Sequence, residues 1–261
     1  MTTAIRFSKM QGLGNDFVIV DALTQTLPHP LPITAMSHRH TGIGCDQLLV
    51  IEASKQADFF CRIFNNDGSQ AKQCGNGLRC VALYLIKNQL HKSNTVFIET
   101  LAGVFPITIY DTANINVQLS VPNIQEVHHT ISLQHQNLSL VLVNVGNPHA
   151  ILKVEKQDTA FQNIIEKVVA SDPAFKEGVN LGFLEILNPT RGRLRTIERG
   201  AGRTLACGSN ACAAAVAGIK EGWFKDHTVQ IDFELGSLSI TWHGEKIEMK
   251  GPAEFVFEGK W

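Results

Sequence analysis

Two cysteines, Cys74 and Cys207, stand where a thiol could do acid–base chemistry. Each is followed by a glycine and opens a long apolar run, in QCGNGLRC (73–80) and ACGSNAC (206–212). Such a run predicts a helix, and the unpaired N–H groups at a helix start favour negative charge. That position lowers the pKa of a thiol, and the same N–H groups can hold a carboxylate. The sequence therefore predicts two anion sites, each with a reactive thiol beside it.

A pair of opposed thiols suits one class of reaction in particular. A thiolate removes a proton from a carbon, and the opposite thiol returns one to the other face. The outcome is inversion at a carbon next to a carboxylate, whose developing charge the helix N–H groups stabilise. This chemistry needs neither pyridoxal phosphate nor a metal, and no glycine-rich cofactor loop is visible. We therefore expect a cofactor-independent racemase or epimerase.

Two other roles for the cysteines are a zinc site and a redox pair. Cys74 and Cys80 lie about 120° apart around a helix, and Cys207 and Cys212 about 140° apart. Neither spacing is that of a zinc-ligand pair, so a metal site would need both halves of the chain. The remaining cysteines fall on apolar segments or beside them and are expected to be structural: Cys45, Cys61, Cys80 and Cys212.

The chain reads as two copies of one unit. GNDFVIV (14–20) returns as GNPHAIL (146–152), and the two cysteine motifs follow in the same order. The offset is 132 residues from Asn15 to Asn147 and 133 residues from Cys74 to Cys207. Gln47 maps to Asn180 at the second offset. Several anchors in one order predict an internal duplication, with one thiol in each half.

The elements that must position the thiols are many short strands and few helices. Helices are expected at 75–90 and 208–223, apolar on nearly all sides and hence buried. An amphipathic helix is expected at 159–171, with a counterpart within 30–40. We expect an α/β fold of two pseudo-symmetric halves. Each is a mostly antiparallel, barrel-like sheet around a central apolar helix, with the active site in the cleft between the halves.

The halves are expected at residues 1–120 and 121–251. The boundary lies near 118–122, around Pro122, and the C-terminal strand 252–261 returns to the first half.

Bulk composition excludes several classes of protein. The net charge is −1 with no block of like charges, which argues against nucleic-acid binding. No segment is apolar enough to cross a bilayer, and the N-terminus lacks the apolar core of a secretion signal. Six cysteines without a signal peptide favour the reducing cytoplasm.

Five sequence blocks resemble one family over essentially the whole chain, the diaminopimelate epimerases. The blocks are GLGNDF (12–17), NNDGSQAKQCGNGLRC (65–80), GNPH (146–149), NLGF (180–183) and ERGAGRTLACGSNACA (198–213). The resemblance implies a cofactor-free, cytoplasmic homodimer that converts LL-2,6-diaminopimelate to the meso form for lysine and peptidoglycan synthesis. The fold it implies agrees with the one expected above.

The resemblance also implies roles for single residues. Cys74 and Cys207 match the two acid–base thiols, and His149 and Glu198 match residues that tune them. Substrate-binding positions are matched by Asn15, Gln47, Asn65, Gly75, Asn76, Asn147, Asn180, Glu198, Arg199, Gly208 and Ser209. The alternative is another cofactor-independent racemase of this fold acting on a different amino acid. Against it stand the residues that serve the non-reacting end of the substrate: Asn65, Asn147, Asn180 and Arg199.

Four residues raise local questions. Glu198 and Arg199 would point to opposite faces of a regular strand, so either the chain is irregular there or one residue acts through its backbone. Arg203 and Asn210 stand where the family usually has Glu and Gly. We expect Arg203 to lie in solvent. We expect Asn210 to bond to the local backbone in the first helical turn, so that Asn210→Gly changes turnover little.

Overall fold

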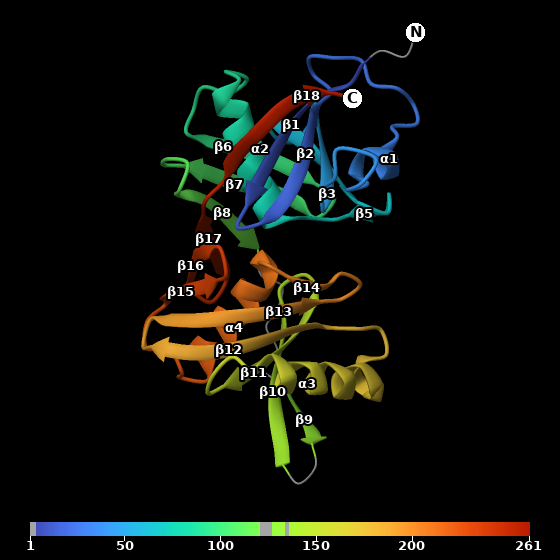
Figure 1. Ribbon diagram of the computed structural model, residues 1–261. Helices are drawn as coiled ribbons and strands as arrows, with labels where there is room; N and C mark the ends of the chain where they lie inside the picture. Colours follow the sequence, from blue (N-terminus) through green and yellow to red (C-terminus); the bar gives the residue numbers. More distant parts are fainter. Residues whose placement is uncertain (1–3, 121–126, 134–135) are drawn as a thin grey trace. The chain divides into compact units, whose positions relative to one another are not determined.

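The computed structural model describes residues 4–120, 127–133 and 136–261 (Figure 1). The chain forms two compact units: unit 1 is Met1–Gln118 with Lys250–Trp261, and unit 2 is Leu119–Met249. Pro122, where the sequence suggests the boundary, lies outside the described residues.

Unit 1 surrounds one buried helix, α2 (Gly75–Lys87), with strands. The strands are β1 (Arg6–Gly12), β2 (Asn15–Asp21), β3 (Gln47–Glu52), β4 (Phe59–Asn65), β5 (Gln70–Ala71), β6 (Thr95–Thr100), β7 (Gly103–Ile109), β8 (Ile115–Ser120) and β18 (Glu254–Lys260). β8 continues into unit 2. A short helix, α1 (Ile33–Ser37), lies within the predicted segment 30–40.

The apolar character of α2 is explained by its burial. Nine of its residues are buried, from Asn76 to Leu85, and the helix ends at Lys87, three residues before the predicted end. The wholly buried Arg79 donates from Nε to the carbonyl of Pro252 at 3.0 Å. That bond ties the C-terminal segment to α2, and β18 pairs antiparallel with β1 along Arg6–Gln11 (Figure 1).

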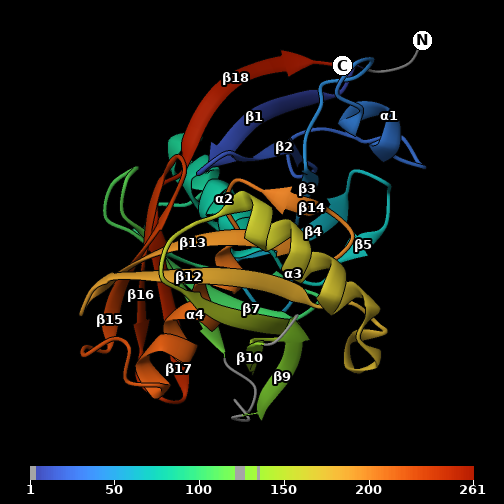
Figure 2. The same ribbon diagram turned by 60° about the horizontal axis from the view of Figure 1, so that its bottom comes forward.

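Unit 2 repeats this plan around α4 (Gly208–Lys220). Its other elements are β9 (Val127–Leu133), β10 (Gln136–Asn144), β11 (Pro148–Val154), α3 (Thr159–Ser171), η1 (Pro173–Phe175), β12 (Asn180–Asn188), β13 (Arg191–Glu198), β14 (Gly202–Thr204), β15 (Thr228–Phe233), β16 (Gly236–Trp242) and β17 (Lys246–Gly251). The buried alanine run of α4 lets strands approach closely. The predicted amphipathic helix is α3 (Figure 2). Its Ile165 and Val169 belong to one buried core cluster with Leu181 and Phe183 of β12.

Strand pairing confirms the internal duplication. β2 pairs parallel with β3, with Phe17 opposite Gln47. β11 pairs parallel with β12, with His149 opposite Asn180. These two pairs correspond through the offsets of 132 and 133 found in the sequence. β4 and β6 are also parallel neighbours, as are β13 and β15. Antiparallel pairs include β1 with β2 and β18, β6 with β7, and β15 with β16. The predicted pair of mostly antiparallel sheets, each around a central helix, is therefore confirmed.

Candidate active site

Cys74 lies at the N-cap of α2, as the sequence predicts. Its backbone is extended, and its Sγ accepts a hydrogen bond from the Gly77 N–H at 3.4 Å. Helix geometry leaves the N–H groups of Gly75 and Asn76, at the first turn, without intrahelical acceptors. A partly buried thiol thus stands beside backbone donors that suit a carboxylate.

Asn15, at the start of β2, connects to this thiol and to the helix start. Its Oδ1 accepts from Asn76 Nδ2 at 3.3 Å and lies 3.9 Å from Cys74 Sγ. Its Nδ2 donates to Asp46 Oδ2 at 2.9 Å, which fixes which side of the amide faces the thiol. Asp46 was missed at the sequence level, although it directly precedes Gln47.

Gln47 and Asn65 face each other across β3 and β4. Gln47 Nε2 donates to Asn65 Oδ1 at 3.0 Å, and Asn65 Nδ2 donates to Ser69 Oγ at 2.9 Å. Buried Gln47 Oε1 has no hydrogen-bond partner among the described residues. The first unit therefore gathers Asn15, Gln47, Asn65, Cys74, Gly75 and Asn76 as the first half-site.

Cys207 occupies the equivalent N-cap of α4. It is 6% exposed, and its Sγ lies 3.4 Å from Ser209 Oγ. Asn147 Nδ2 reaches Ser209 Oγ at 3.5 Å, which repeats the contact between Asn15 and Asn76 in the other unit. Asn147 Oδ1 lies 3.0 Å from Nε2 of the buried His149. A chain of polar contacts thus leads from His149 to the Cys207 thiol.

The polar residues on β12 and just beyond β13 complete this second half-site. Asn180 donates from Nδ2 to the Pro148 carbonyl at 3.0 Å and accepts the Arg199 backbone N–H at 3.1 Å. Glu198 is the last residue of β13, and Arg199 lies beyond the strand end. Arg199 therefore acts on Asn180 through its backbone, while its NH1 donates to the Glu177 carbonyl at 3.3 Å. With Gly208 at the first position of α4, this second half-site comprises Asn147, His149, Asn180, Glu198, Arg199, Cys207, Gly208 and Ser209.

The electrostatics of Cys207 differ from the sequence prediction. Burial raises the pKa of this thiol well above its ordinary value, and the nearby Glu198 carboxylate raises it further. The hydrogen bond with Ser209 and the Asn210 backbone N–H act in the opposite direction without overcoming burial. The expected lowering by the helix start is therefore wrong for Cys207, which is a neutral thiol at neutral pH.

Replacing Glu198 by Gln is expected to lower the pKa of Cys207, because it removes the negative charge that opposes thiolate formation. The measurement is the pH dependence of alkylation by iodoacetamide, followed at Cys207 by mass spectrometry in a Cys74→Ser background. The midpoint should move to lower pH. A matched control is Glu185→Gln, which removes a carboxylate paired with Arg193 at 3.4 Å elsewhere on the sheet. A midpoint that stays put or rises in Glu198→Gln contradicts the assignment.

Two departures from the family pattern form contacts with elements that are distant in sequence. Arg203 is exposed, as expected, and its NH1 and NH2 donate to Gln162 Oε1 at 3.1 Å and Asn163 Oδ1 at 2.7 Å on α3. Asn210 was expected to bond locally, but it is wholly buried and donates to the carbonyl of Leu181, 29 positions away. The expectation for Asn210 is wrong because α4 packs directly on β12.

The other four cysteines are buried, and none of them forms a disulfide among the described residues. Burial raises the pKa of Cys80 to about 12 and also raises that of Cys61. No three His, Cys, Asp or Glu side chains gather as a metal cluster among the described residues. In the described part of the chain, no helix is long and apolar enough to cross a membrane.

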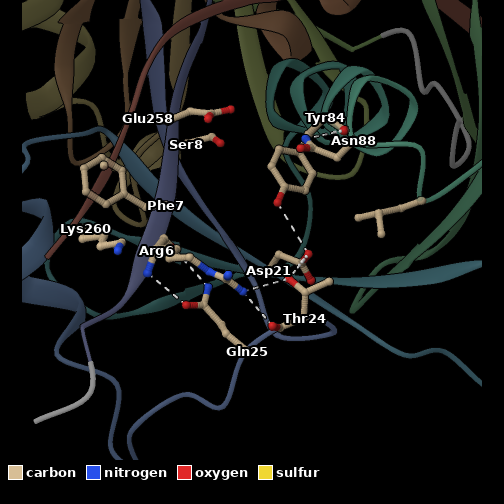
Figure 3. A pocket seen from close by; sticks show the side chains of 12 residues that line it. Arg6, Phe7, Ser8, Asp21, Thr24, Gln25, Tyr84, Asn88, Glu258 and Lys260 are labelled. Carbon is tan, nitrogen blue, oxygen red and sulfur yellow. Dashed lines mark hydrogen bonds between the residues drawn. The ribbon is translucent and has the colours of Figure 1, made fainter.

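A pocket of about 510 Å³ lies elsewhere in unit 1 (Figure 3). Arg6, Asp21 and Tyr84 line it, and the Tyr84 hydroxyl reaches Asp21 Oδ2 at 3.5 Å. It contains none of the predicted site residues.

Known proteins match this chain along nearly its whole length. Residues 7–124 and 141–256 match the diaminopimelate epimerase family. The diaminopimelate epimerase of Ectopseudomonas mendocina is 39% identical and that of Alkalilimnicola ehrlichii 41% identical, and each match covers 98% of both chains.

Solved structures support the fold alone. A PhzF-family phenazine biosynthesis protein of Bacillus anthracis has a TM-score of 0.73 at 17% identity and covers 99% of both chains. A hydroxyproline epimerase from Agrobacterium vitis has a TM-score of 0.76 at 12% identity and covers 98% of this chain and 92% of that one. The family match and the full-length relatives lead to one conclusion. The chain belongs to the diaminopimelate epimerase family.

Proposed function

We propose that this chain is a cofactor-independent epimerase that interconverts LL-2,6-diaminopimelate and meso-diaminopimelate, a step of lysine and peptidoglycan precursor synthesis. The observation that carries the proposal is the duplicated half-site. In each unit a cysteine occupies the N-cap of the central helix, and the second residue of that helix contacts an asparagine at the start of a strand or directly before it. Full-length relatives with this activity in their names support the choice of substrate.

The reaction uses the two thiols in turn. One cysteine, as thiolate, takes the α-proton and becomes a thiol, while the other thiol gives its proton to the opposite face and becomes a thiolate. The protonation states are thereby exchanged, and the reverse direction starts from the exchanged form. The proposal requires both thiols to reach opposite faces of one α-carbon. Because burial keeps the Cys207 thiol protonated, Cys207 is the proton donor in the resting form.

The remaining site residues divide between the two ends of the substrate. N–H groups of Gly75, Asn76, Gly208 and Ser209 hold the reacting carboxylate and stabilise the charge that develops on it. The non-reacting amino-acid end is held by amides and a guanidinium, which suit an ammonium and a carboxylate. These residues are Asn15, Gln47, Asn65, Asn147, Asn180 and Arg199. His149 and Glu198 adjust the Cys207 thiol.

The direct test is turnover of LL-diaminopimelate by purified protein without added cofactor, with both isomers separated by chromatography. Formation of meso-diaminopimelate to an equilibrium mixture is expected. Proline, hydroxyproline, glutamate and lysine serve as competing substrates. Inversion of one of them without inversion of diaminopimelate would overturn the proposal in favour of another racemase of this fold.

We also propose that the enzyme is a cytoplasmic homodimer. Reduced thiols are required by the mechanism, and none of the six cysteines, all of which the structure describes, forms a disulfide. β18 presents Val256, 55% exposed, and Phe257, 48% exposed, beside its pairing with β1. Exposed apolar side chains on a strand favour association of two copies.

Sedimentation velocity tests the dimer. The wild-type chain is expected to sediment as a dimer, and Phe257→Glu as a folded monomer. Leu235→Glu is the matched control, because Leu235 is 58% exposed in a turn of unit 2 and is expected to leave the dimer intact. A monomeric wild type, or a dimeric Phe257→Glu, contradicts the assignment of β18 to the interface.

A further inference from the structure

Asn210 is an amide buried beneath the second half-site, at the third position of α4. Its side chain is 0% exposed, and its Nδ2 donates to the Leu181 carbonyl at 3.1 Å and to Thr196 Oγ1. A backbone carbonyl only accepts hydrogen bonds, so the atom facing Leu181 must be the amide nitrogen. The orientation of the Asn210 amide is therefore fixed by the backbone of β12.

The opposite side of that amide faces His149. Asn210 and His149 interact through their side chains, and His149 is 1% exposed. Two buried side-chain atoms of the described part of unit 2 have no assigned hydrogen-bond partner, namely Asn210 Oδ1 and His149 Nδ1. Gly182 leaves the space that Oδ1 fills, because a Cβ there would lie 2.6 Å from it. The Asn210 oxygen is thus held in the space beside Gly182 of β12.

His149 is presented with more acceptors than it has protons. Burial lowers the pKa of His149 to about 3, so the ring is neutral at physiological pH and carries one N–H. Asn210 Oδ1 faces it on one side, and Asn147 Oδ1 lies 3.0 Å from Nε2 on the other. One of the two amides must turn its nitrogen to the ring. Asn210 is fixed by Leu181, whereas Asn147 contacts Ser209 Oγ, a hydroxyl that both donates and accepts.

We propose that Asn210 is a positioning residue that holds His149 in the Nδ1–H form and so sets the direction of the hydrogen bonds that lead to Cys207. His149 Nδ1–H donates to Asn210 Oδ1, and Nε2 accepts from the Asn147 amide nitrogen. Asn147 Oδ1 then accepts the Ser209 hydroxyl proton. The Ser209 oxygen is left as an acceptor for the Cys207 S–H, which lies 3.4 Å away.

The consequence for the proposed reaction concerns the resting protonation state of Cys207. In this direction the Ser209 hydroxyl does not donate to the Cys207 sulfur, so the thiol is favoured over the thiolate. Without Asn210, His149 can adopt the Nε2–H form, Asn147 can donate to Ser209, and Ser209 can donate to a thiolate. The charged groups that face this chain are Arg199, which acts on His149, and Glu198, which acts on Cys207. Neither is altered by a change at Asn210.

The tautomer is directly measurable in the substrate-free protein. Long-range ¹H–¹⁵N spectra distinguish the two ring nitrogens, and the His149 signals are identified by their absence in His149→Gln. The wild type is expected to show a protonated Nδ1 and an unprotonated Nε2. Asn210→Gly should change the ratio of the two tautomers by about tenfold or more, the equivalent of one buried hydrogen bond. A wild-type ring protonated at Nε2 overturns the proposal even if the variant does not fold.

Thr196→Val is the matched control, because it removes another hydrogen bond of the same buried amide but leaves the Leu181 carbonyl in place. Its His149 tautomer should be that of the wild type. The same tautomer in Asn210→Gly as in the wild type contradicts the positioning role.

The pH profile of kcat/KM gives a second readout that a merely structural role would not move. This part rests on the proposed epimerase function. Asn210→Gly should shift the limb that reports Cys207 to lower pH, whereas Thr196→Val should not. An unshifted limb with a changed tautomer overturns the link to Cys207. The spectra need no substrate. Failure of the tautomer prediction can therefore be distinguished from failure of the proposed epimerase function.

Discussion

Replacing either Cys74 or Cys207 by Ala is expected to lower the rate of epimerisation by about 10³-fold or more, within the range for loss of a positioned acid or base. Both effects should appear in kcat, since a two-base reaction stops when either proton cannot be moved. Substrate binding should change less, because the N–H groups at the two helix starts remain. Chromatographic separation of the LL and meso isomers measures the loss.

Each single variant retains the other thiol, which leads to a sharper expectation. The remaining thiol can still exchange the α-proton of the isomer whose proton faces it, without inverting the carbon. Cys74→Ala should therefore slowly exchange the α-proton of one isomer with solvent, and Cys207→Ala that of the other isomer. Cys61→Ala is the control, since Cys61 is buried in β4 and has no proposed role. Full activity in either of the first two variants would sink the thiol mechanism.

Replacing Asp16 by Asn is expected to destabilise the protein by about 3 kcal/mol, the scale for breaking a buried ion pair. The Asp16 carboxylate bonds Lys9 Nζ at 2.5 Å and Arg39 NH2 at 2.7 Å, and Lys9 is 7% exposed. Removing the charge leaves the buried ammonium of Lys9, which also donates to the Gly44 carbonyl, without the counter-ion that Asp16 supplies. Urea unfolding at pH 7 measures the loss.

The same carboxylate gives the stability a pH dependence. Burial by itself raises the pKa of Asp16, but hydrogen bonds from Arg39 and Lys9 outweigh it and lower the pKa from 3.8 to about 2. A carboxyl group whose pKa is lower in the folded state than in the unfolded state stabilises the fold. The stabilisation is complete at pH values above the unfolded-state pKa, and it is lost as the pH falls through the folded-state pKa. Wild-type stability should therefore fall by about 1–2 kcal/mol more than that of Asp16→Asn between pH 5 and pH 2.

Glu52→Gln serves as the matched control for Asp16→Asn. It breaks an exposed ion pair with Arg62 at 2.8 Å in the same unit, and such pairs contribute about 1 kcal/mol or less. Equal stability of Asp16→Asn and the wild type at pH 7 contradicts the role given to Asp16.

Asp16→Asn is also expected to change KM for diaminopimelate, because Asp16 is connected to Asn15 through Asp46. The Asp46 carboxylate orients Asn15 and accepts from Arg39, and the Asp46 N–H donates to Asp16.

Much of the fold could be predicted because the duplicated motifs recur at a nearly constant offset in the sequence. The offsets of 132 and 133 place Asn15, Gln47 and Cys74 on elements equivalent to those of Asn147, Asn180 and Cys207, and the parallel registers follow them. The helix ends were less accurate. α2 and α4 end at Lys87 and Lys220, three residues before the predicted ends, since capping depends on local backbone geometry.

Properties that depend on tertiary burial could not be predicted. The helix start at Cys207 is visible in the sequence, but the burial and the Glu198 carboxylate that raise its pKa are not. Asn210 looks like a tolerated helix residue, yet its partners Leu181, Thr196 and His149 come from three strands. Pairings between elements far apart in sequence leave no local signal at the residue itself.

The central claim is that two thiols act on opposite faces of one α-carbon. In the most direct measurement, LL-diaminopimelate is incubated with the enzyme in D₂O, and the deuterium content of both isomers is followed before equilibrium is approached. The two-thiol reaction predicts meso product that carries deuterium at the inverted carbon, while recovered LL substrate stays largely unlabelled. Deuterium that enters recovered substrate as fast as product forms would show a single base serving both faces, and would contradict the account.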